Sequence, residues 1–219
     1  MYATGSPFMN ILEERYEKLG IKILGSYVQY LAGAAFVKEP EDVLNPYAKH
    51  TEKMRILNMR THAHIWEGLG YRVTYIPYAE IVPATQTGIV DGVATIGAET
   101  TYILLRGIAK YWLPANTNLE AWFLCLNLDI WNSLTDEDQK VILCAAKKLE
   151  DKRFKEASED MEYWENVLRK EGIHVFDMTD AQREAFQKRI REYVTPRLKQ
   201  DFGEEFIERV VDAIKASLE

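Results

Sequence analysis

The residue with the clearest chemical potential is Arg55, which lies in the short apolar run Met54–Leu57. A guanidinium presents a flat fork of N–H donors, which matches a carboxylate through two parallel hydrogen bonds. If the run is a strand that opens toward a cleft, Arg55 would be placed to bind an organic acid. The same residue type in the same place can instead pair with a nearby Asp or Glu, and the residue alone leaves both interpretations open.

No other group of residues predicts catalytic chemistry. His62 and His64 are two positions apart, so on a helix they would face different sides, which is poor geometry for one metal ion. We expect them to be helix-surface histidines. The sequence contains no nucleophile elbow, phosphate-binding loop, paired-cysteine motif or histidine-rich metal signature. It therefore predicts no enzyme activity, no metal site and no cofactor.

The elements that would position Arg55 follow an alternating pattern between Lys53 and Glu99. Arg55 is in a predicted strand, and further strands are predicted over 71–77 and 89–97, with helices over 59–69 and 78–87 between them. Strands that alternate with helices of this length indicate a parallel α/β sheet. Ligands in such sheets bind outside the carboxyl ends of the strands. We therefore expect Arg55, Tyr78 and the turn Asp91–Glu99 to lie near one crevice.

The rest of the chain also shows regular patterns. Residues 1–6 are expected to fray, and residues 45–52 read as a solvated loop, with the alternative that they reshape the mouth of the cleft. Pro196 is expected to bend or end the helix in which it lies. The predicted elements are a helix over Phe8–Leu19, strands over Ile21–Ser26, Tyr27–Val37, Leu119–Asn127 and Ile173–Phe176, a long helix over Thr135–Lys170 capped by Thr135, a helix from Thr179 and a last helix over Glu204–Leu218.

Bulk properties exclude some functions. The 219 residues carry a net charge of −7 with no basic block, so nucleic acid is not an expected partner. The apolar runs are far too short to span a membrane. Cys125 and Cys144 lie in apolar surroundings and are expected to be buried thiols, while their spacing leaves a disulfide open. The first ten residues have neither the basic start nor the apolar core of a signal peptide.

A combination of motifs points to a known family. The motifs, at residues 53–57, 68–73, 76–92 and 134–140, are KMRIL, GLGYRV, IPYAEIVPATQTGIVDG and LTDEDQK. Together they resemble the substrate-binding proteins of tripartite ATP-independent periplasmic (TRAP) transporters, from about Met9 to the C-terminus. The resemblance implies an α/β fold of the type II periplasmic-binding-protein class, with a mixed or parallel sheet, a long back helix and C-terminal helices.

Family members extend further at the N-terminus, so the resemblance also implies that the first lobe is incomplete here. The chain then reads as a domain-sized piece or a shortened gene. The expected parts are a first-lobe remnant over 1–26, a second-lobe ligand-binding core over 27–118, a first-lobe strand and long helix over 119–160, and a C-terminal helical part that packs on the second lobe over 161–219.

The implied function is capture of a small organic acid in the periplasm and its delivery to the membrane permease subunits of the transporter. Arg55 would grip the carboxylate and the ring of Tyr78 would flank the solute. This chain has Val93-Ala94-Thr95 where the family usually has an Asn that touches the carboxylate, so Thr95 is a weak substitute. Glu99 would accept hydrogen bonds from an amine or hydroxyl of the solute, or pair with Arg55. Trp122 lies on a strand that closes the cleft, although core packing is its commoner role.

Two other functions stay open at this stage. One is a truncated, dimerising remnant that binds no small molecule. The other is a small α/β enzyme that uses Glu99, or His62 and His64. The strand Leu119–Asn127 is strongly apolar and would lack its neighbours in a shortened first lobe, which makes it prone to pair with another chain. We therefore expect a homodimer with this strand or the helix Thr135–Lys170 in the interface.

Overall fold

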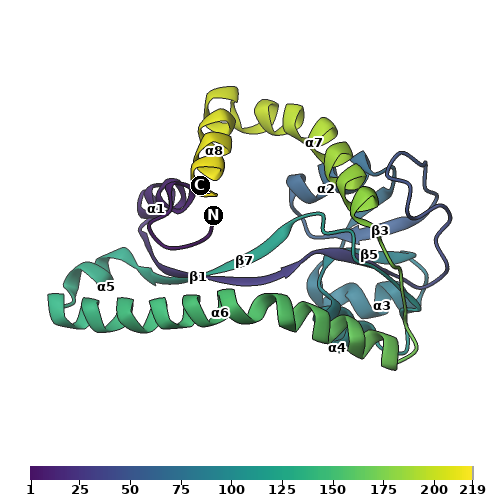
Figure 1. Cartoon of the computed structure of the whole chain (residues 1–219), viewed down its shortest axis with the longest axis horizontal. Coiled ribbons are helices and arrows are strands. Elements are labelled where there is room, and N and C mark those ends of the chain that lie inside the picture. Colours follow the sequence, from purple (N-terminus) through teal and green to yellow (C-terminus); the bar gives the residue numbers. More distant parts are fainter. Residues whose placement is uncertain (219) are drawn as a thin grey trace. The chain divides into compact units, whose positions relative to one another are not determined.

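The computed structural model describes residues 1–218, and the chain forms two compact units. Unit 1 comprises Met1–Tyr30, Glu120–Ser158 and Phe202–Glu219, and unit 2 comprises Leu31–Leu119 and Glu159–Asp201. Each unit is described by itself below, and Figure 1 shows the elements along the chain. No helix in the described residues is both long enough and apolar enough to cross a membrane.

Unit 2 is built on a six-stranded mixed sheet with the order β4-β3-β5-β2-β6-β8. β3 pairs in parallel with both β4 and β5, while β2 runs antiparallel to β5 and β6, and β6 is parallel to β8. The predicted α/β fold with a mixed or parallel sheet is confirmed. The strands are β2 (Gly33–Phe36), β3 (Lys53–Ile56), β4 (Arg72–Tyr75), β5 (Gly92–Ile96), β6 (Tyr111–Leu113) and β8 (His174–Val175).

Helices cover both faces of this sheet and form two cores. α2 (Arg60–Gly68) and α7 (Asp180–Phe202) cover one face, where Trp66 and Phe186 are fully buried with Met54 and Ile56. On the other face, Val93 packs in a second core with Leu168 of α6. The helices of that face are α3 (Ile81–Gln86), α4 (Ala98–Leu105) and the end of α6 (Asp136–Lys170), and a short 3₁₀ turn, η1 (Tyr78–Glu80), precedes α3. Burial on both faces explains the apolar strand sequences.

The turn after α2 requires a glycine, and the loop formed by residues 45–52 packs against this turn. Gly70 has φ +88°, and a Cβ there would lie 2.2 Å from the Ala48 carbonyl oxygen. His50 donates its backbone N–H to the Gly70 carbonyl (3.1 Å), and its ring stacks on Tyr71 with centroids 4.0 Å apart. The loop is thus packed beside the start of β3, so the idea that it shapes a mouth at the carboxyl ends of the strands is wrong.

Unit 1 contains a two-stranded sheet of β1 (Ile21–Leu31) and β7 (Leu119–Asn127). The two strands predicted over 21–26 and 27–37 are instead one strand to Leu31, followed by β2 from Gly33. A small core of Leu24, Trp131 and Ala146 joins β1 to α5 (Leu128–Ser133) and to the first half of α6.

The last helix, α8 (Glu204–Ala216), packs on the first helix, α1 (Pro7–Glu17), within unit 1. Arg209 pairs with Glu14 at 2.6 Å, and the Arg15 guanidinium lies 4.0 Å from the centre of the Phe206 ring. This differs from the expectation that all of residues 161–219 would pack on the second lobe. The difference arises because α7 ends at Phe202 and Gly203, with φ +90°, starts a separate helix.

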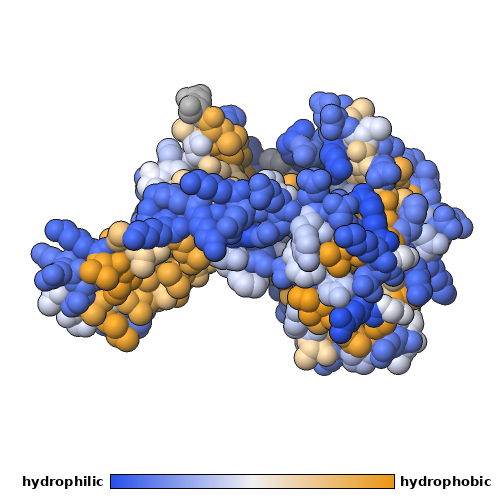
Figure 2. Space-filling view, turned by 60° about the horizontal axis from the view of Figure 1, so that its bottom comes forward, coloured by the Kyte–Doolittle hydropathy of each residue, from blue (hydrophilic) through white to orange (hydrophobic). Residues whose placement is uncertain are grey.

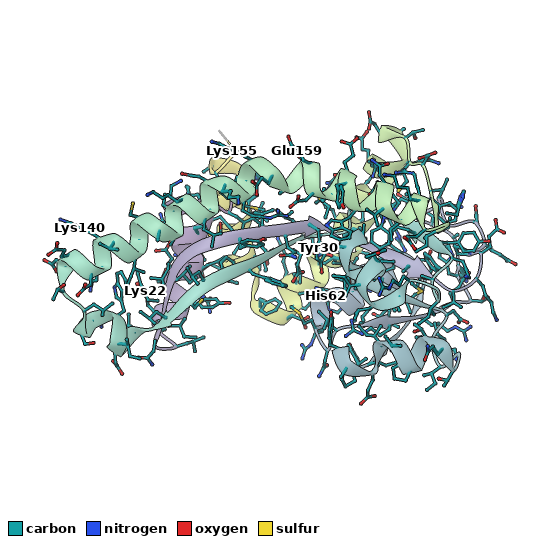
Figure 3. All side chains as sticks on the ribbon, turned by 90° about the horizontal axis from the view of Figure 1, so that it is seen from below. Lys22, Tyr30, His62, Lys140, Lys155 and Glu159 are labelled. Carbon is teal, nitrogen blue, oxygen red and sulfur yellow. The ribbon has the colours of Figure 1, made fainter. Side chains whose placement is uncertain are left out.

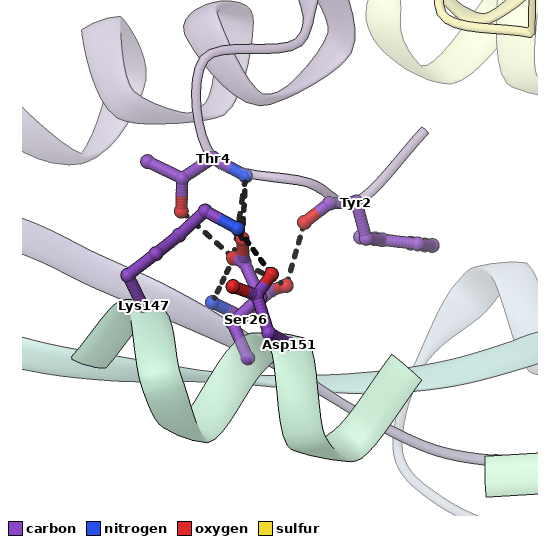
Figure 4. A network of polar contacts seen from close by, with 6 residues as sticks. Tyr2, Thr4, Ser26, Lys147 and Asp151 are labelled. Carbon is purple, nitrogen blue, oxygen red and sulfur yellow. Dashed lines mark hydrogen bonds and ion pairs between the residues drawn. The ribbon is translucent and has the colours of Figure 1, made fainter. Parts of the chain in front are cut away.

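The first residues are held in place by a buried carboxylate rather than frayed. Glu150 of α6 is fully buried, and it accepts hydrogen bonds from Thr4 N (3.1 Å), Thr4 Oγ1 (2.7 Å) and Ser26 N (3.0 Å) (Figure 4). Ser26 Oγ lies 2.5 Å from the Tyr2 carbonyl oxygen. Burial alone would raise the pKa of Glu150, but the hydrogen bonds from Thr4 and Ser26 outweigh it and hold the pKa below its usual range.

The two long helices differ in how well the sequence predicted their ends. α6 spans 35 residues, and Thr135 Oγ1 accepts the Asp138 N–H at 3.2 Å, so its predicted cap is confirmed. Pro196 is expected to bend or end its helix. It does not end α7, because the helix continues to Phe202. Pro196 and Glu192, whose carbonyl loses its helical donor, are both exposed, so water can bind the freed carbonyl.

Apolar side chains on unit 1 remain in contact with solvent. Both cysteines are free and exposed, so the prediction of buried thiols is wrong. Cys144 is two positions from the buried Ala146 and therefore faces the other side of α6. Figure 2 shows apolar residues in orange toward the end where α5 lies. The exposed apolar residues of unit 1 include Trp122, Leu124, Ile130 and Val141.

Candidate functional site

Arg55 lies on β3, between its parallel neighbours β4 and β5. It is level with Thr74 of β4 and with Val93 of β5, and its side chain is 1% exposed. Its Nε–H donates to the Ile76 carbonyl oxygen at 2.9 Å. Ile76 directly follows β4, so this bond holds the guanidinium toward the carboxyl edge of the sheet. A positive charge is thereby fixed where ligands of α/β sheets bind.

Tyr78 follows the end of β4 and begins η1. Its side chain is 58% exposed, so the alternative that it packs in the core is wrong. An exposed ring at this edge offers apolar surface with a hydroxyl at its tip. Tyr78 is therefore available to contact a bound molecule, in contrast to Tyr71, which directly precedes β4 and is buried.

Thr95 sits near the end of β5 in a strained conformation. Its φ is +59°, which is unusual for a β-branched residue and costs about 1–3 kcal/mol. It is 2% exposed, and its hydroxyl accepts a hydrogen bond from the Trp66 indole N–H at 2.9 Å. The bond to Trp66 helps to hold this backbone shape. Thr95 thus fixes the end of β5 against α2, and its hydroxyl proton remains available to an acceptor.

Glu99 lies in the first turn of α4, directly after β5, and is half-buried. A carboxylate in this position is stabilised by the positive end of the helix dipole. Arg55, Tyr78, Thr95 and Glu99 therefore follow or end neighbouring parallel strands, and the structure brings them to the same edge of the sheet.

Asp91 lies at the opposite edge, so the expectation that the whole turn Asp91–Glu99 lines one crevice is wrong for this residue. Its Oδ2 accepts the Lys53 N–H at 2.9 Å, which joins the start of β5 to the start of β3. A surface hollow of about 230 Å³ lies beside it, lined by Lys38, Glu39, Glu41, Thr51, Glu52 and Asp91. Within residues 1–218, no group of three or more His, Cys, Asp or Glu side chains is arranged to hold a metal ion.

His62 is the residue that the sequence interpretation missed. The sequence predicts it on the helix surface, but it is only 6% exposed. Its side chain is labelled in Figure 3. Burial, helped by the positive charge of Arg55, lowers the pKa of His62 to about 4. The signal was its spacing of three and four positions from Ile65 and Trp66, which puts all three on one face of α2.

His64 has a structural partner. Its Nε2 lies 2.9 Å from Asp201 Oδ2, and Arg60 Nη1 donates to Asp201 Oδ1 at 2.8 Å. These contacts tie the first turns of α2 to the end of α7. His64 therefore stabilises the packing of two helices within unit 2, and it shares no metal geometry with His62.

Trp122 belongs to unit 1. It is 56% exposed and stacks on Tyr27 with ring centroids 6.4 Å apart. The Arg153 guanidinium lies 5.1 Å from the Tyr27 ring centre, and its Nη2 donates to the Gln29 carbonyl at 2.8 Å. The commoner role of a core tryptophan is therefore wrong for Trp122, whose ring remains open to solvent.

Comparison with known proteins identifies a family and several similar structures. Residues 3–201 match the family described as bacterial extracellular solute-binding protein, family 7 (DctP). The ectoine-binding periplasmic protein TeaA of Halomonas elongata is 25% identical over 215 residues, which cover 93% of this chain and 59% of that protein. A structure of this ectoine-binding protein is similar with a TM-score of 0.86 at 21% identity, over 99% of this chain and 69% of that one.

Two further structures share the fold. A TRAP periplasmic solute-binding protein of Desulfovibrio salexigens with bound orotic acid has a TM-score of 0.83 at 16% identity, over 96% of this chain and 67% of that one. One from Sulfitobacter sp. NAS-14.1 with bound β-D-galacturonate has a TM-score of 0.80 at 21% identity, over 95% of this chain and 67% of that one.

These comparisons confirm the resemblance drawn from the motifs. The chain spans 59% of the length of the curated ectoine-binding relative. The matched family consists of solute-binding proteins rather than enzymes, which agrees with the prediction of no enzyme activity. Because the match extends over residues 3–201, this chain belongs to the bacterial extracellular solute-binding protein family 7.

Proposed function

We propose that this protein captures a small organic acid outside the cytoplasm and delivers it to the membrane permease of a TRAP-type transporter. The observation that carries the proposal is Arg55, a buried guanidinium that is held by the Ile76 carbonyl at the carboxyl edge of the sheet. Its planar fork of N–H donors matches the two oxygens of a carboxylate.

The proposed contacts have different roles. Arg55 binds the carboxylate through parallel hydrogen bonds, and the exposed Tyr78 ring covers apolar parts of the solute. Thr95 contributes a hydroxyl at the end of β5, and Glu99 accepts hydrogen bonds from an amine or hydroxyl of the solute. On the basis of the sequence, we also propose that Trp122 contacts the solute. Its ring is exposed, which supports this role.

The class of solute follows from these side chains. Ectoine, orotic acid and galacturonate, which the compared proteins bind, all carry a carboxyl group. A guanidinium and a carboxylate at one edge favour an acid that also has an N–H or O–H donor. Such binding needs no metal and no cofactor.

The test is a binding screen with the purified chain. Thermal shift and calorimetry with ectoine, orotate, D-galacturonate and 2-acetolactate should identify at least one acid that binds. Arg72→Ala is a matched control, because Arg72 is an exposed arginine at the start of β4, on the opposite edge of the sheet. Binding that depends on Arg55 and not on Arg72 supports the proposal, and a complete absence of binding to acids contradicts it.

The permease and the location are part of the same proposal. A chain of an extracellular solute-binding family is expected in the periplasm, where it would meet the membrane subunits. Transport into vesicles that contain a TRAP permease, measured with and without the purified protein, tests the partnership. Uptake that does not change when the protein is added would argue against it.

We also propose that a second copy of this chain covers the apolar surface of unit 1. β7 has nine residues and pairs only with β1 among the described strands. Trp122 and Leu124 on this strand are 56% and 44% exposed, respectively. Pairing of two copies along β7 or α6 would remove these side chains from water.

A further inference from the structure

His62 lies near the proposed site, and none of the contacts proposed above involves it. It lies in the first turn of α2, the helix that follows β3, which carries Arg55. In a parallel strand–helix–strand connection the helix begins at the carboxyl edge of the sheet, so this turn is at the same edge as Arg55. Its side chain is more than nine-tenths buried.

One ring nitrogen of His62 is buried without a hydrogen-bond partner. Its Nδ1 is buried and makes no hydrogen bond to any of residues 1–218. Burial and the charge of Arg55 both disfavour the imidazolium form, so one ring nitrogen carries a proton at neutral pH and the other does not.

Burial decides which nitrogen carries the proton. A proton on Nδ1 would be a buried donor without an acceptor among residues 1–218. A proton on Nε2 avoids this unpaired donor. The favoured tautomer therefore has its proton on Nε2, which makes His62 a neutral donor at the carboxyl edge of the sheet.

We propose that His62 is a solute-binding residue, which donates its Nε2–H to the same acidic group that Arg55 binds. The inference rests on the proposed function and specifies how its site recognises an acid. Arg55 and His62 can offer only N–H donors to this group. A carboxylate accepts at both oxygens, whereas a carboxamide would turn an NH₂ group toward one of the donors. The pair therefore selects acids over their amides.

The experiment uses the whole chain and the acid that binds best among orotate, D-galacturonate and ectoine, together with the amide of that acid. His62→Leu keeps a similar volume but removes the donor, and His62→Gln restores an N–H. His64→Gln is the matched control, because His64 lies on the same helix and has Asp201 as its partner. Circular dichroism and melting curves establish that each variant is folded.

The expected result is a loss of affinity of about 10- to 100-fold for His62→Leu, the scale for a hydrogen bond to a charged group. His62→Gln should regain most of the affinity, and His64→Gln should bind as the wild type does. The preference for the acid over its amide should shrink in His62→Leu. Unchanged affinity and unchanged preference in a folded His62→Leu variant would overturn the inference and leave the role of Arg55 intact.

A second measurement does not depend on solute binding. Long-range ¹H–¹⁵N spectra of histidine-labelled protein report the tautomer of His62 at pH 7. The neutral form with its proton on Nε2 is expected, and the Nδ1–H form or the imidazolium would overturn the inference. If the wild type binds none of the acids, the proposed function fails and this inference fails with it.

Discussion

Arg55 is the single residue on which the proposed recognition depends most. Its environment is unusual, because a guanidinium that is 1% exposed sits between two parallel neighbours and is anchored by one backbone carbonyl. His62 and Thr95 are also buried polar residues near the ends of these strands. Thr95 adds a backbone angle that its residue type rarely adopts. Strain and buried polarity at one edge of a sheet are typical of binding sites.

Replacement of Arg55 by alanine should abolish most of the binding of an organic acid. The change removes a charge-assisted pair and leaves the solute carboxylate without its partner, which costs about 2–5 kcal/mol. Calorimetry with the best-binding acid measures the loss, and Arg72→Ala should leave the affinity unchanged. Equal affinities for Arg55→Ala and the wild type would refute the assignment.

Replacement of Tyr78 by alanine should weaken binding by a smaller amount. The substitution removes contact area rather than charge, and burial of an apolar side chain is worth roughly 1–3 kcal/mol. Because Tyr78 is 58% exposed, the fold should keep its melting temperature. A larger loss for Tyr78→Ala than for Arg55→Ala in the same calorimetric series would mean that the solute is mainly apolar or aromatic.

At the scale of elements, hydrogen bonds of buried side chains hold the strands and helices of each unit together. In unit 2, the bonds Arg55–Ile76 and Trp66–Thr95 tie β3, β4, β5 and α2 together at the edge where the site is proposed. In unit 1, the Glu150 carboxylate of α6 accepts hydrogen bonds from Thr4 near the start of the chain and from Ser26 of β1. Glu150 therefore orders a segment that has no regular structure of its own.

The Glu150 network should make unit 1 sensitive to acid. Because the folded state lowers the pKa of Glu150, its contribution to stability is complete above the pKa of an unfolded Glu and is lost as the pH falls through the lower folded value. In urea unfolding between pH 7 and pH 3, the free energy of unfolding of Glu150→Gln should fall less steeply than that of the wild type.

Asp151→Asn is the control for this measurement, because Asp151 is an exposed neighbour on the same helix, paired with Lys147. Its pH dependence should follow the wild type. Parallel curves for the wild type and Glu150→Gln would show that the network does not supply the acid sensitivity.

At the scale of the molecule, the main physical problem is apolar surface that unit 1 leaves in water. Val141 is 65% exposed on α6, and Trp122 and Leu124 are exposed on β7. Burial of such side chains is worth about 1.5–3 kcal/mol each, against a typical domain stability of about 5–15 kcal/mol. We therefore propose that another chain covers this surface.

We expect a dimer in solution, with β7 or α6 in the interface. Light scattering over a dilution series should give twice the chain mass at high concentration. Substitution of Trp122 and Leu124 by Ser should shift the equilibrium toward the monomer, while Leu19→Ser, at an exposed apolar residue just after α1, should not. A folded monomer at all concentrations that binds no dye for apolar surfaces would contradict this prediction.

The sequence by itself predicted much of the local structure and indicated the family of this protein. Alternating strand and helix patterns predicted β3, α2, β4 and β5, and the cap at Thr135 predicted the start of α6, because these features depend on neighbours within a few positions. Arg55 was identifiable because a lone charged residue in an apolar strand has few explanations. The motifs around it indicated the family, which the match over residues 3–201 then established.

Only the tertiary structure decided which side chains are buried and with whom they bond. His62 is buried because the inward face of α2 packs on the sheet, and Thr95 takes its strained shape against Trp66. Thr4 meets Glu150 across 146 positions of sequence. Cys125 is exposed on the two-stranded sheet of β1 and β7. Such contacts join residues distant in the chain, and local pattern carries no information about distant partners.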